Sequence, residues 1–364
     1  MNYRIDPAAK EAAYLQLYRA LVTDITGAVY PFGARLPSKR VLAAETGVSV
    51  ITAGHAIQLL CDEGYAECRE RSGCFVIYRE RDFLPSAAPT FQPESRPASP
   101  VLPANSFPFS VLARTMRKVL QDRSESILIK SPNHGCDVLR DEIRAYLARS
   151  RGIQVSPEQI IIGSGAEYLY GLIAQLLGTD SIYALEDPCY EKIRRVYTSM
   201  GIRCESLPLT MDGIPSAALR RTKAAVLHVT PFNSYPSLIS ADISKKLEYI
   251  RWARERGATL IEDNYDSELT VSGKPEDTLF SLAGGRQVLY VNTFSHTIAP
   301  SIRIGYLLLP QELVRPFHDQ LGFYSCTVPV FDQYVLAELL RSGDFERHIN
   351  RIRRQKRKNA RETT

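Results

Sequence analysis

The amino-acid sequence predicts a multi-domain protein, with a small, mainly α-helical N-terminal unit and a larger α/β unit built on a mixed, mostly parallel sheet. Its 364 residues exceed the size of one typical domain. A proline-rich stretch separates two regions of different pattern. Beyond it, short apolar runs alternate with segments long enough for helices, which is the order of a parallel α/β sheet. We therefore expect an N-terminal domain at 1–80, a linker at 81–106 and a large domain at 107–364.

The N-terminal residues indicate three helices followed by a hairpin. Residues 11–28 have the apolar spacing of an amphipathic helix that ends near Gly27. Ser38 and Ser49 are candidate N-caps of two further helices, and Gly47 permits a tight turn between them. Helix, glycine-containing turn and helix form the helix-turn-helix arrangement. Residues 65–78, with a turn at Ser72-Gly73, indicate a two-stranded wing.

This region resembles the GntR-type winged helix-turn-helix, chiefly at Arg35-Leu36-Pro37-Ser38, Gly47-Val48-Ser49 and Glu63-Gly64-Tyr65. The resemblance implies binding to a double-stranded DNA operator. Cations and hydroxyls at helix starts suit phosphate contacts. The residues implied to face DNA are Arg35, Ser38, Lys39, Arg40, Ser49, Thr52, His55, Arg71, Ser72 and Gly73. The alternative is a helical core without DNA contact, in keeping with nine Lys/Arg against nine Asp/Glu in residues 1–80.

The stretch that follows has seven prolines among residues 80–109 and neither helical nor alternating periodicity. We expect an extended, semi-rigid spacer. Such a spacer permits a domain-exchanged homodimer, which palindromic operators favour.

The composition favours a folded globular protein and argues against membrane and secreted classes. An apolar fraction of 45% is ample for a packed core, and no run approaches the length of a membrane helix. The N-terminus lacks the apolar core of a signal peptide. Seven cysteines without a C-x-x-C pair argue against a disulfide framework or a structural zinc site, so we expect a cytoplasmic protein without a membrane anchor.

The chain from Arg341 onward carries nine basic and three acidic residues. One interpretation is an arm that binds nucleic acid. The other is a charged helix face, which the near-helical spacing of Phe345, Ile349 and Ile352 favours.

In the large domain, the apolar runs at 160–162, 182–185, 225–229, 259–261 and 288–291 are the expected strands. Ligands of parallel sheets bind at the carboxyl ends of the strands. Thr293, Ser295 and Arg303 there would suit a phosphate dianion, and a solvated loop is the alternative. Asp263 follows a buried strand, where a pyridinium N–H, a helix cap or a salt bridge would offset its burial.

Residues 293–306 resemble the lysine loop of aspartate-aminotransferase-type enzymes, in the version carried by the MocR branch of GntR regulators. There the pattern is close to Thr-Phe-Ser-Lys-Thr-Leu-x-Pro-x-Leu-Arg-x-Gly-Tyr. The resemblance implies the fold of that family and a pocket for pyridoxal 5'-phosphate. It implies phosphate contacts from Ser164, Gly165, Ala166, Thr293, Ser295 and Arg303. Tyr190 would stack on the ring, Asn233 and Tyr265 would contact the ring oxygen, and Asp263 would bind the pyridine nitrogen.

The family's Schiff-base lysine is His296 in this chain. An imidazole cannot replace the lysine amine. We therefore expect no catalytic residue and, for pyridoxal 5'-phosphate, non-covalent binding only. No nearby His or Cys has metal-ligand spacing. The chain also stops short of the family's usual end, so we expect an incomplete small domain.

Together these features predict a DNA-binding transcriptional regulator of the GntR/MocR type. Its degenerate aminotransferase-like domain would bind a small effector, either vitamin B6 or an amino-acid-like compound, and would form a homodimer. The alternatives are an active aminotransferase, which would need another lysine near the ring, and an inactive remnant.

Overall fold

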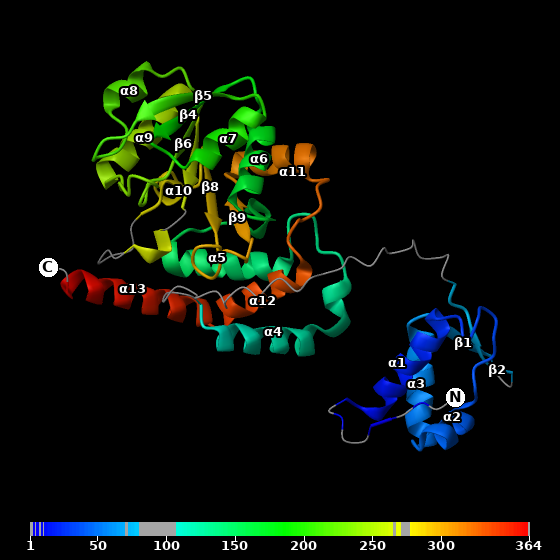
Figure 1. Ribbon diagram of the computed structural model, residues 1–364. Coiled ribbons are helices and arrows are strands. Elements are labelled where there is room, and N and C mark those ends of the chain that lie inside the picture. The colour runs from blue at the N-terminus through cyan, green and yellow to red at the C-terminus, as the bar shows by residue number, and fades with distance from the viewer. Residues whose placement is uncertain are drawn as a thin grey trace. The chain divides into compact units, whose positions relative to one another are not determined.

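The computed structural model describes residues 3, 5–6, 9, 11–69, 72–79, 107–264, 267–270 and 277–362. Its contacts divide the chain into two compact units, Met1–Pro100 and Val101–Thr364, drawn in Figure 1. The expected linker at 81–106 lies outside the described residues. Among the described residues, no helix combines the length and the apolarity that crossing a bilayer requires.

The N-terminal unit is a winged helix-turn-helix, as predicted. Its helices are α1 (Ala13–Thr26), α2 (Lys39–Thr46) and α3 (Val50–Asp62). Ser38 caps α2 by accepting from the Val41 N–H at 3.4 Å, and Ser49 caps α3 by accepting from the Thr52 N–H at 3.0 Å. Gly47 ends α2 with φ +72°, a left-handed conformation that glycine adopts without a steric penalty.

The wing of this unit consists of β1 (Ala66–Arg69) and β2 (Gly73–Val76), which pair antiparallel. Cys68 and Cys74 lie directly opposite each other and form a disulfide, with Cα atoms 3.9 Å apart. The expectation that the cysteines form no disulfide is therefore wrong at this pair. Residues directly opposite in an antiparallel pair have close Cβ atoms, which the spacing of cysteines along the chain does not reveal.

Seven strands form the sheet of the larger unit, in the order β3-β9-β8-β7-β6-β4-β5. β9 is antiparallel to both β3 and β8, and the other neighbouring pairs are parallel. The predicted mixed, mostly parallel sheet is confirmed. Its strands are β3 (Ile160–Gly163), β4 (Ile182–Asp187), β5 (Arg203–Pro208), β6 (Val226–Val229), β7 (Thr259–Asp263), β8 (Val288–Thr293) and β9 (Gly305–Leu308).

Helices cover both faces of this sheet (Figure 1). Successive strand residues point to opposite faces, so Ile160 and Ile162 join one apolar cluster and Ile161 joins the other. The first cluster includes residues of α5 (Asp137–Arg151), α8 (Ser216–Arg221), α9 (Ile243–Arg256), α10 (Leu279–Leu282), α12 (Val330–Arg341) and α13 (Asp344–Glu362). The second includes residues of α6 (Ala166–Leu177), α7 (Glu191–Ser199) and α11 (Gln311–Leu321). Short 3-10 turns are η2 (Ser124–Leu128), η3 (Pro157–Gln159) and η4 (Ser267–Leu269).

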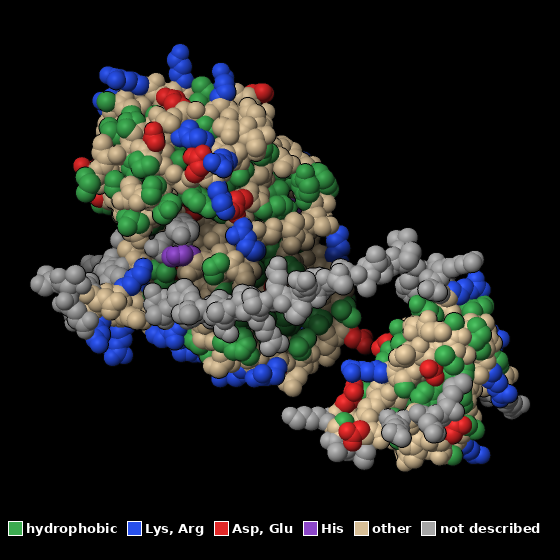
Figure 2. Space-filling model, in the orientation of Figure 1, with side chains coloured by type: hydrophobic (Ala, Val, Ile, Leu, Met, Phe, Trp, Pro, Cys, Tyr) green, Lys and Arg blue, Asp and Glu red, His purple; other side chains and the backbone are tan. Residues whose placement is uncertain are grey.

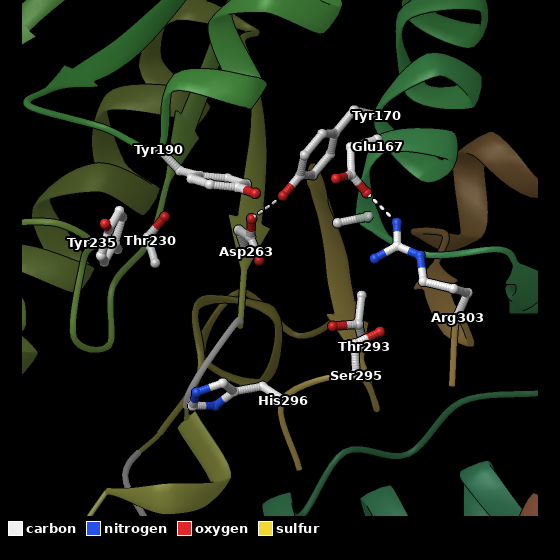
Figure 3. A pocket seen from close by; sticks show the side chains of 11 residues that line it. Glu167, Tyr170, Tyr190, Thr230, Tyr235, Asp263, Thr293, Ser295, His296 and Arg303 are labelled. Atoms are coloured by element: carbon white, nitrogen blue, oxygen red, sulfur yellow. Dashed lines mark hydrogen bonds and ion pairs between the residues drawn. The ribbon is translucent and has the colours of Figure 1, made fainter. Parts of the chain in front are cut away.

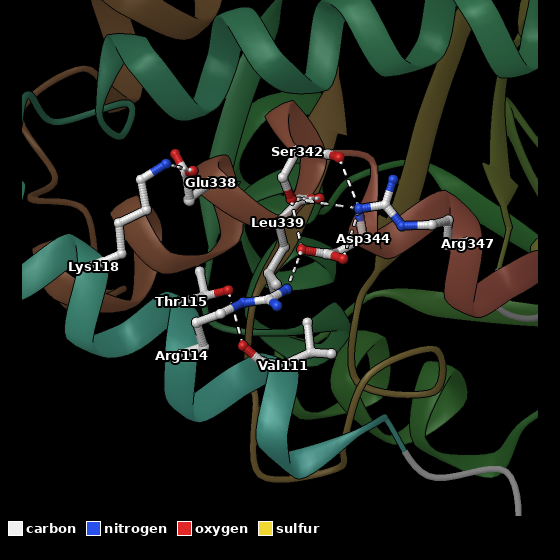
Figure 4. Close-up of polar contacts among 9 residues, drawn as sticks. All are labelled: Val111, Arg114, Thr115, Lys118, Glu338, Leu339, Ser342, Asp344 and Arg347. Atoms are coloured by element: carbon white, nitrogen blue, oxygen red, sulfur yellow. Dashed lines mark hydrogen bonds and ion pairs between the residues drawn. The ribbon is translucent and has the colours of Figure 1, made fainter.

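Charged contacts join α4 (Phe109–Arg123) to α12 and α13 (Figure 4). Lys118 Nζ lies 2.6 Å from Glu338 Oε1, and Arg114 Nη2 lies 3.5 Å from Asp344 Oδ2. Asp344 also accepts from Arg347 at 2.7 Å. The start of α13 is therefore held by contacts both to its own first turn and to α4.

The basic C-terminal stretch is a helix with one apolar face, as its spacing predicted. Phe345, Ile349 and Ile352 are buried in the first apolar cluster. Arg353 and Lys356 donate to the carbonyls of Glu268 and Leu269. Figure 2 shows Lys and Arg side chains along the edge of this unit that α4 and α13 form.

Replacing Phe345 by alanine is expected to lower the free energy of unfolding by about 3–5 kcal/mol. The side chain is 1% exposed, and its ring packs 5.4 Å from Tyr146 and 5.5 Å from Phe294, so truncation leaves a cavity. Urea unfolding of Phe345→Ala against the wild type measures the loss. Arg354→Ala, at an exposed position of the same helix, is the control and should change little. Equal stability of all three proteins would contradict the packing described.

Candidate functional site

A pocket of about 360 Å³ opens at the carboxyl ends of β4, β6, β7 and β8, where the sequence predicted a ligand site (Figure 3). Aromatic rings, carboxylates and hydroxyls line it together with one guanidinium and one imidazole. Its described lining residues are Ala166, Glu167, Tyr170, Tyr190, Thr230, Tyr235, Asp263, Thr293, Ser295, His296 and Arg303.

The turn between β8 and β9 supplies the side of the pocket that carries His296. Helix α13 holds this turn in place. Phe294 packs against Phe345, and His348 Nε2 lies 2.9 Å from the Thr297 carbonyl oxygen. The Ser295 hydroxyl donates to the Ile302 carbonyl at 2.8 Å, which closes the turn on itself. His296 is exposed and lies along the wall of the pocket (Figure 3).

Asp263 ends β7 and is 5% exposed at the floor of the pocket. The Tyr170 hydroxyl donates a hydrogen bond to its Oδ2 atom (Figure 3), and His228 Nε2 lies 3.7 Å from the same atom. Burial and the Asp263 carboxylate hold the pKa of Tyr170 well above its ordinary value, so the hydroxyl remains a donor. The buried carboxylate is thus partnered from within the protein.

Arg303 is the only cation among the described residues that line the pocket. Its Nη2 atom lies 2.6 Å from Glu167 Oε2, in the first turn of α6 (Figure 3). The other oxygen of Glu167 lies 2.9 Å from Lys192 Nζ. Gly165 has φ +96°, and a Cβ there would come within 2.6 Å of Arg303 Nη2. Glycine at 165 therefore allows the guanidinium to approach the start of the helix.

The pocket gathers seven of the residues predicted from the sequence to hold a ligand: Ala166, Tyr190, Asp263, Thr293, Ser295, His296 and Arg303. Ser164 and Gly165 are next to it without lining it, and the Ser164 hydroxyl accepts from Thr327 at 2.9 Å. Asn233 does not line the pocket. Its amide Nδ2 lies 3.3 Å from Thr270 Oγ1, and its backbone N–H donates to Ser240. Tyr265 lies outside the described residues.

Thr230 directly follows the expected strand at 225–229, where the sequence predicts ligand contacts. Three lining residues were not predicted: Glu167, Tyr170 and Tyr235. A signal for Glu167 was present, because an acid directly after a glycine-rich turn lies at the helix N-terminus where an anion would bind. Tyr170 follows Glu167 by about one helical turn and so faces the same side. The sequence offers no comparable signal for Tyr235, whose ring lies 6.1 Å from that of Tyr190.

Glu186 at the end of β4 supports the pocket from outside its lining. It is 3% exposed, and its Oε2 atom accepts from the Thr230 N–H at 3.1 Å and the Ser234 hydroxyl at 2.7 Å. Burial raises the pKa of Glu186 to about 7, against the opposing effect of these two hydrogen bonds. Glu186 therefore ties the loop after β6 to β4 and changes charge near neutral pH.

The second candidate surface is formed by the starts of α2 and α3 and by the wing. Arg35, Ser38, Lys39, Arg40, Ser49, His55 and Ser72 are exposed there, and Thr52 and Gly73 are partly exposed. The Arg35 guanidinium lies against Gly73 of the wing, where a Cβ would come within 2.7 Å of Nε. Arg71 lies outside the described residues. Ile51, 73% exposed at the start of α3, was not predicted; an apolar side chain at this position suits contact with thymine methyl groups.

Comparisons with known proteins match both units. Residues 13–76 match the model of bacterial regulatory proteins of the gntR family, and residues 101–364 match that of aminotransferase class I and II. The "Uncharacterized HTH-type transcriptional regulator YdeL" of Bacillus subtilis (strain 168) is 31% identical over 95% of this chain and 77% of its own. The "Probable rhizopine catabolism regulatory protein MocR" of Rhizobium meliloti is 28% identical over 96% of this chain and 76% of its own.

The chain belongs to the MocR type of GntR-family transcriptional regulators. The prediction of a regulator that carries an aminotransferase-like domain is thereby confirmed. A solved structure with the same fold is LysN, an alpha-aminoadipate aminotransferase from Thermus thermophilus. It has a TM-score of 0.61 and 26% identity, and the match covers 68% of this regulator and 64% of that chain. The regulator thus spans about three quarters of its curated relatives and under two thirds of this enzyme.

Enzymes of the aminotransferase fold use pyridoxal 5'-phosphate, and the regulator's pocket fits only part of that cofactor. Tyr190 and Asp263, which the resemblance assigns to the ring, both line the pocket. The lysine that forms the covalent link in the family pattern is replaced, because His296 stands at its position. Two of the residues that the resemblance assigns to the phosphate are engaged, because Arg303 is paired with Glu167 and the Ser295 hydroxyl proton with a carbonyl. The residues present therefore do not fit a covalently bound, phosphorylated cofactor.

The regulator is expected to lose stability as pH rises from 5 to 8, through Glu186. The folded-state pKa of about 7 lies above the ordinary value of 4.5, so the folded state is favoured fully below about pH 4.5 and this advantage is lost as pH rises through 7. The contribution is on the order of 3 kcal/mol. Urea unfolding at pH 5, 6, 7 and 8 measures it, and Glu186→Gln should show a flatter dependence. Identical slopes for both proteins would contradict the assignment.

Proposed function

We propose that the regulator binds a double-stranded DNA operator through its helix-turn-helix and takes a small-molecule effector reversibly in the pocket of its aminotransferase-like domain. Reversible binding of the effector is supported by His296, which lies on the pocket wall. In the family pattern this position holds the reactive lysine. An imidazole binds and releases a ligand without forming a covalent link to its carbonyl.

No lysine is among the described residues that line the pocket. Lys192 lies beside two lining residues, with Nζ 5.8 Å from the centre of the Tyr190 ring and 2.9 Å from Glu167 Oε1. Hydrogen bonds to Glu167 and Tyr190 raise the pKa of Lys192, so its amine stays protonated and is a poor nucleophile. The geometry therefore supports a binding module over an active aminotransferase.

The ligand class follows from the lining. Tyr190 and Tyr235 offer aromatic faces, and Asp263 offers a carboxylate to a ring nitrogen or an amine. LysN, with the same fold, was solved with N-(5'-phosphopyridoxyl)-L-leucine. Vitamin B6 compounds and amino-acid-like compounds both fit this chemistry, and we propose that B6 compounds, including pyridoxal 5'-phosphate, bind here only non-covalently.

Exposed apolar side chains of the larger unit support the proposal of a homodimer. Leu128 and Ile129 are adjacent and 82% and 68% exposed, and Phe109 and Phe323 are exposed as well. Exposed large apolar side chains on a folded unit are common where a partner packs. A dimer would place two helix-turn-helix units on the two halves of a palindromic operator.

Arg40→Gln is expected to weaken binding to operator DNA about uniformly across sequences and to lower the slope of log K against log salt concentration by about 1. The exposed Arg40 guanidinium follows the Ser38 cap, where a phosphate would lie. Gel shifts with the upstream region of the regulator's own gene at several salt concentrations measure this. Arg19→Gln, an exposed cation on α1 paired with Glu11, is the matched control. An Arg40→Gln protein with the wild-type slope would contradict the proposed DNA surface.

His296→Lys is expected to gain a covalent adduct with pyridoxal 5'-phosphate that borohydride fixes and that mass spectrometry locates at position 296. The lysine amine supplies the nucleophile that the imidazole lacks. The wild-type protein treated identically should carry no adduct within the pocket. We expect no transamination by the variant, because Arg303 is paired with Glu167 and no second guanidinium among the described lining residues could hold a substrate carboxylate. An adduct on a pocket residue of the wild-type chain would show that the protein still binds the cofactor covalently. That result would favour the alternative of an active aminotransferase.

A further inference from the structure

The carboxylate of Glu167 lies where a phosphate group would bind. It belongs to the first turn of α6, it pairs with Arg303 at 2.6 Å, and it pairs with Lys192 at 2.9 Å. A helix N-terminus with two cations beside it is the usual setting of a bound anion. In this chain a protein carboxylate already provides that anion.

Glu167 is charged at neutral pH. Burial alone would raise its pKa, but the hydrogen bond from Lys192, the backbone N–H at 167 and the hydrogen bond from Arg303 lower the pKa to about 2. The carboxylate therefore does not become neutral to make room for another anion under physiological conditions.

Two further donors near the start of α6 are also engaged. The Gly165 N–H donates to the Gly163 carbonyl at 2.9 Å, and the Ser295 hydroxyl donates to Ile302. A phosphate dianion would have to break these contacts before it could use either donor.

The charge of the pocket points the same way. Among the described lining residues, two carboxylates, Glu167 and Asp263, face one guanidinium, Arg303. Arg303 and Lys192 both pair with Glu167, so Asp263 is the carboxylate that a protonated amine of the ligand would meet. The aromatic faces of Tyr190 and Tyr235 attract cations, and Lys192 already lies over the first of them. Positive charge on the ligand is favoured, and a second anion beside Glu167 is disfavoured.

We infer that Glu167 fills the anion site with the protein's own carboxylate, so that the pocket selects a phosphate-free ligand that carries a protonated amine. This rests on the proposed effector function and names the ligand class for the same pocket. A phosphorylated form of the same compound binds more weakly, because it competes with Glu167 for Arg303.

Pyridoxamine and pyridoxamine 5'-phosphate test the inference, because they differ only in the phosphate and neither has an aldehyde that could react with lysines. Isothermal titration of the full chain should give tighter binding of pyridoxamine to the wild-type protein. Glu167→Gln should shift the ratio of the two dissociation constants at least tenfold toward the phosphorylated compound. Glu191→Gln removes an exposed carboxylate just after Tyr190, outside the pocket lining and paired with Arg195, and should match the wild type.

Inorganic phosphate provides a second readout that does not depend on the ring. It should raise the thermal unfolding temperature of Glu167→Gln more than that of the wild type or Glu191→Gln. Tighter binding of pyridoxamine 5'-phosphate to the wild type, or an unchanged ratio in Glu167→Gln, would overturn the inference while leaving the effector pocket intact. Failure of all three proteins to bind either compound would instead overturn the proposed B6-type effector pocket, and this inference with it.

Discussion

The pocket depends on the turn between β8 and β9, which contacts α13 and the first turn of α6. In α13, Phe345 packs against Phe294 and His348 contacts the Thr297 carbonyl. Beside it, Arg303 reaches the first turn of α6 through Glu167. An apolar contact and an ion pair thus fix one short segment, and that segment places His296 on the pocket wall. The C-terminal helix therefore contributes to the binding site without lining it.

Much of this architecture follows from apolar patterning. The buried runs that became β3, β4, β6, β7 and β8 were recognisable because both faces of such strands are covered, and the caps at Ser38 and Ser49 have a direct sequence signature. β5 was not predicted, because its residues are largely polar or part-exposed, whereas β3 at the other edge of the sheet is apolar and buried.

The pocket was predictable as a location and less so in its chemistry. Residues after the strands converge because the strands are parallel, so seven expected residues line it. Pairing between side chains is not visible in a sequence. The ion pair of Glu167 with Arg303 and the hydrogen bond of Tyr170 to Asp263 join positions 136 and 93 residues apart. The disulfide of the wing was missed for the same reason, because register across a hairpin decides which cysteines meet.

The order of strands in the sheet also has a consequence during synthesis of the chain on the ribosome. β3 is the first strand of this sheet to be made, yet it pairs only with β9, whose residues 305–308 are made last among the strands. Until β9 emerges, β3 stays without its hydrogen-bonding neighbour, and such non-local pairing slows folding and exposes nascent chains to aggregation. The winged helix-turn-helix, whose contacts are local, has no such delay, so the DNA-binding unit is expected to be complete while the effector domain is still being assembled.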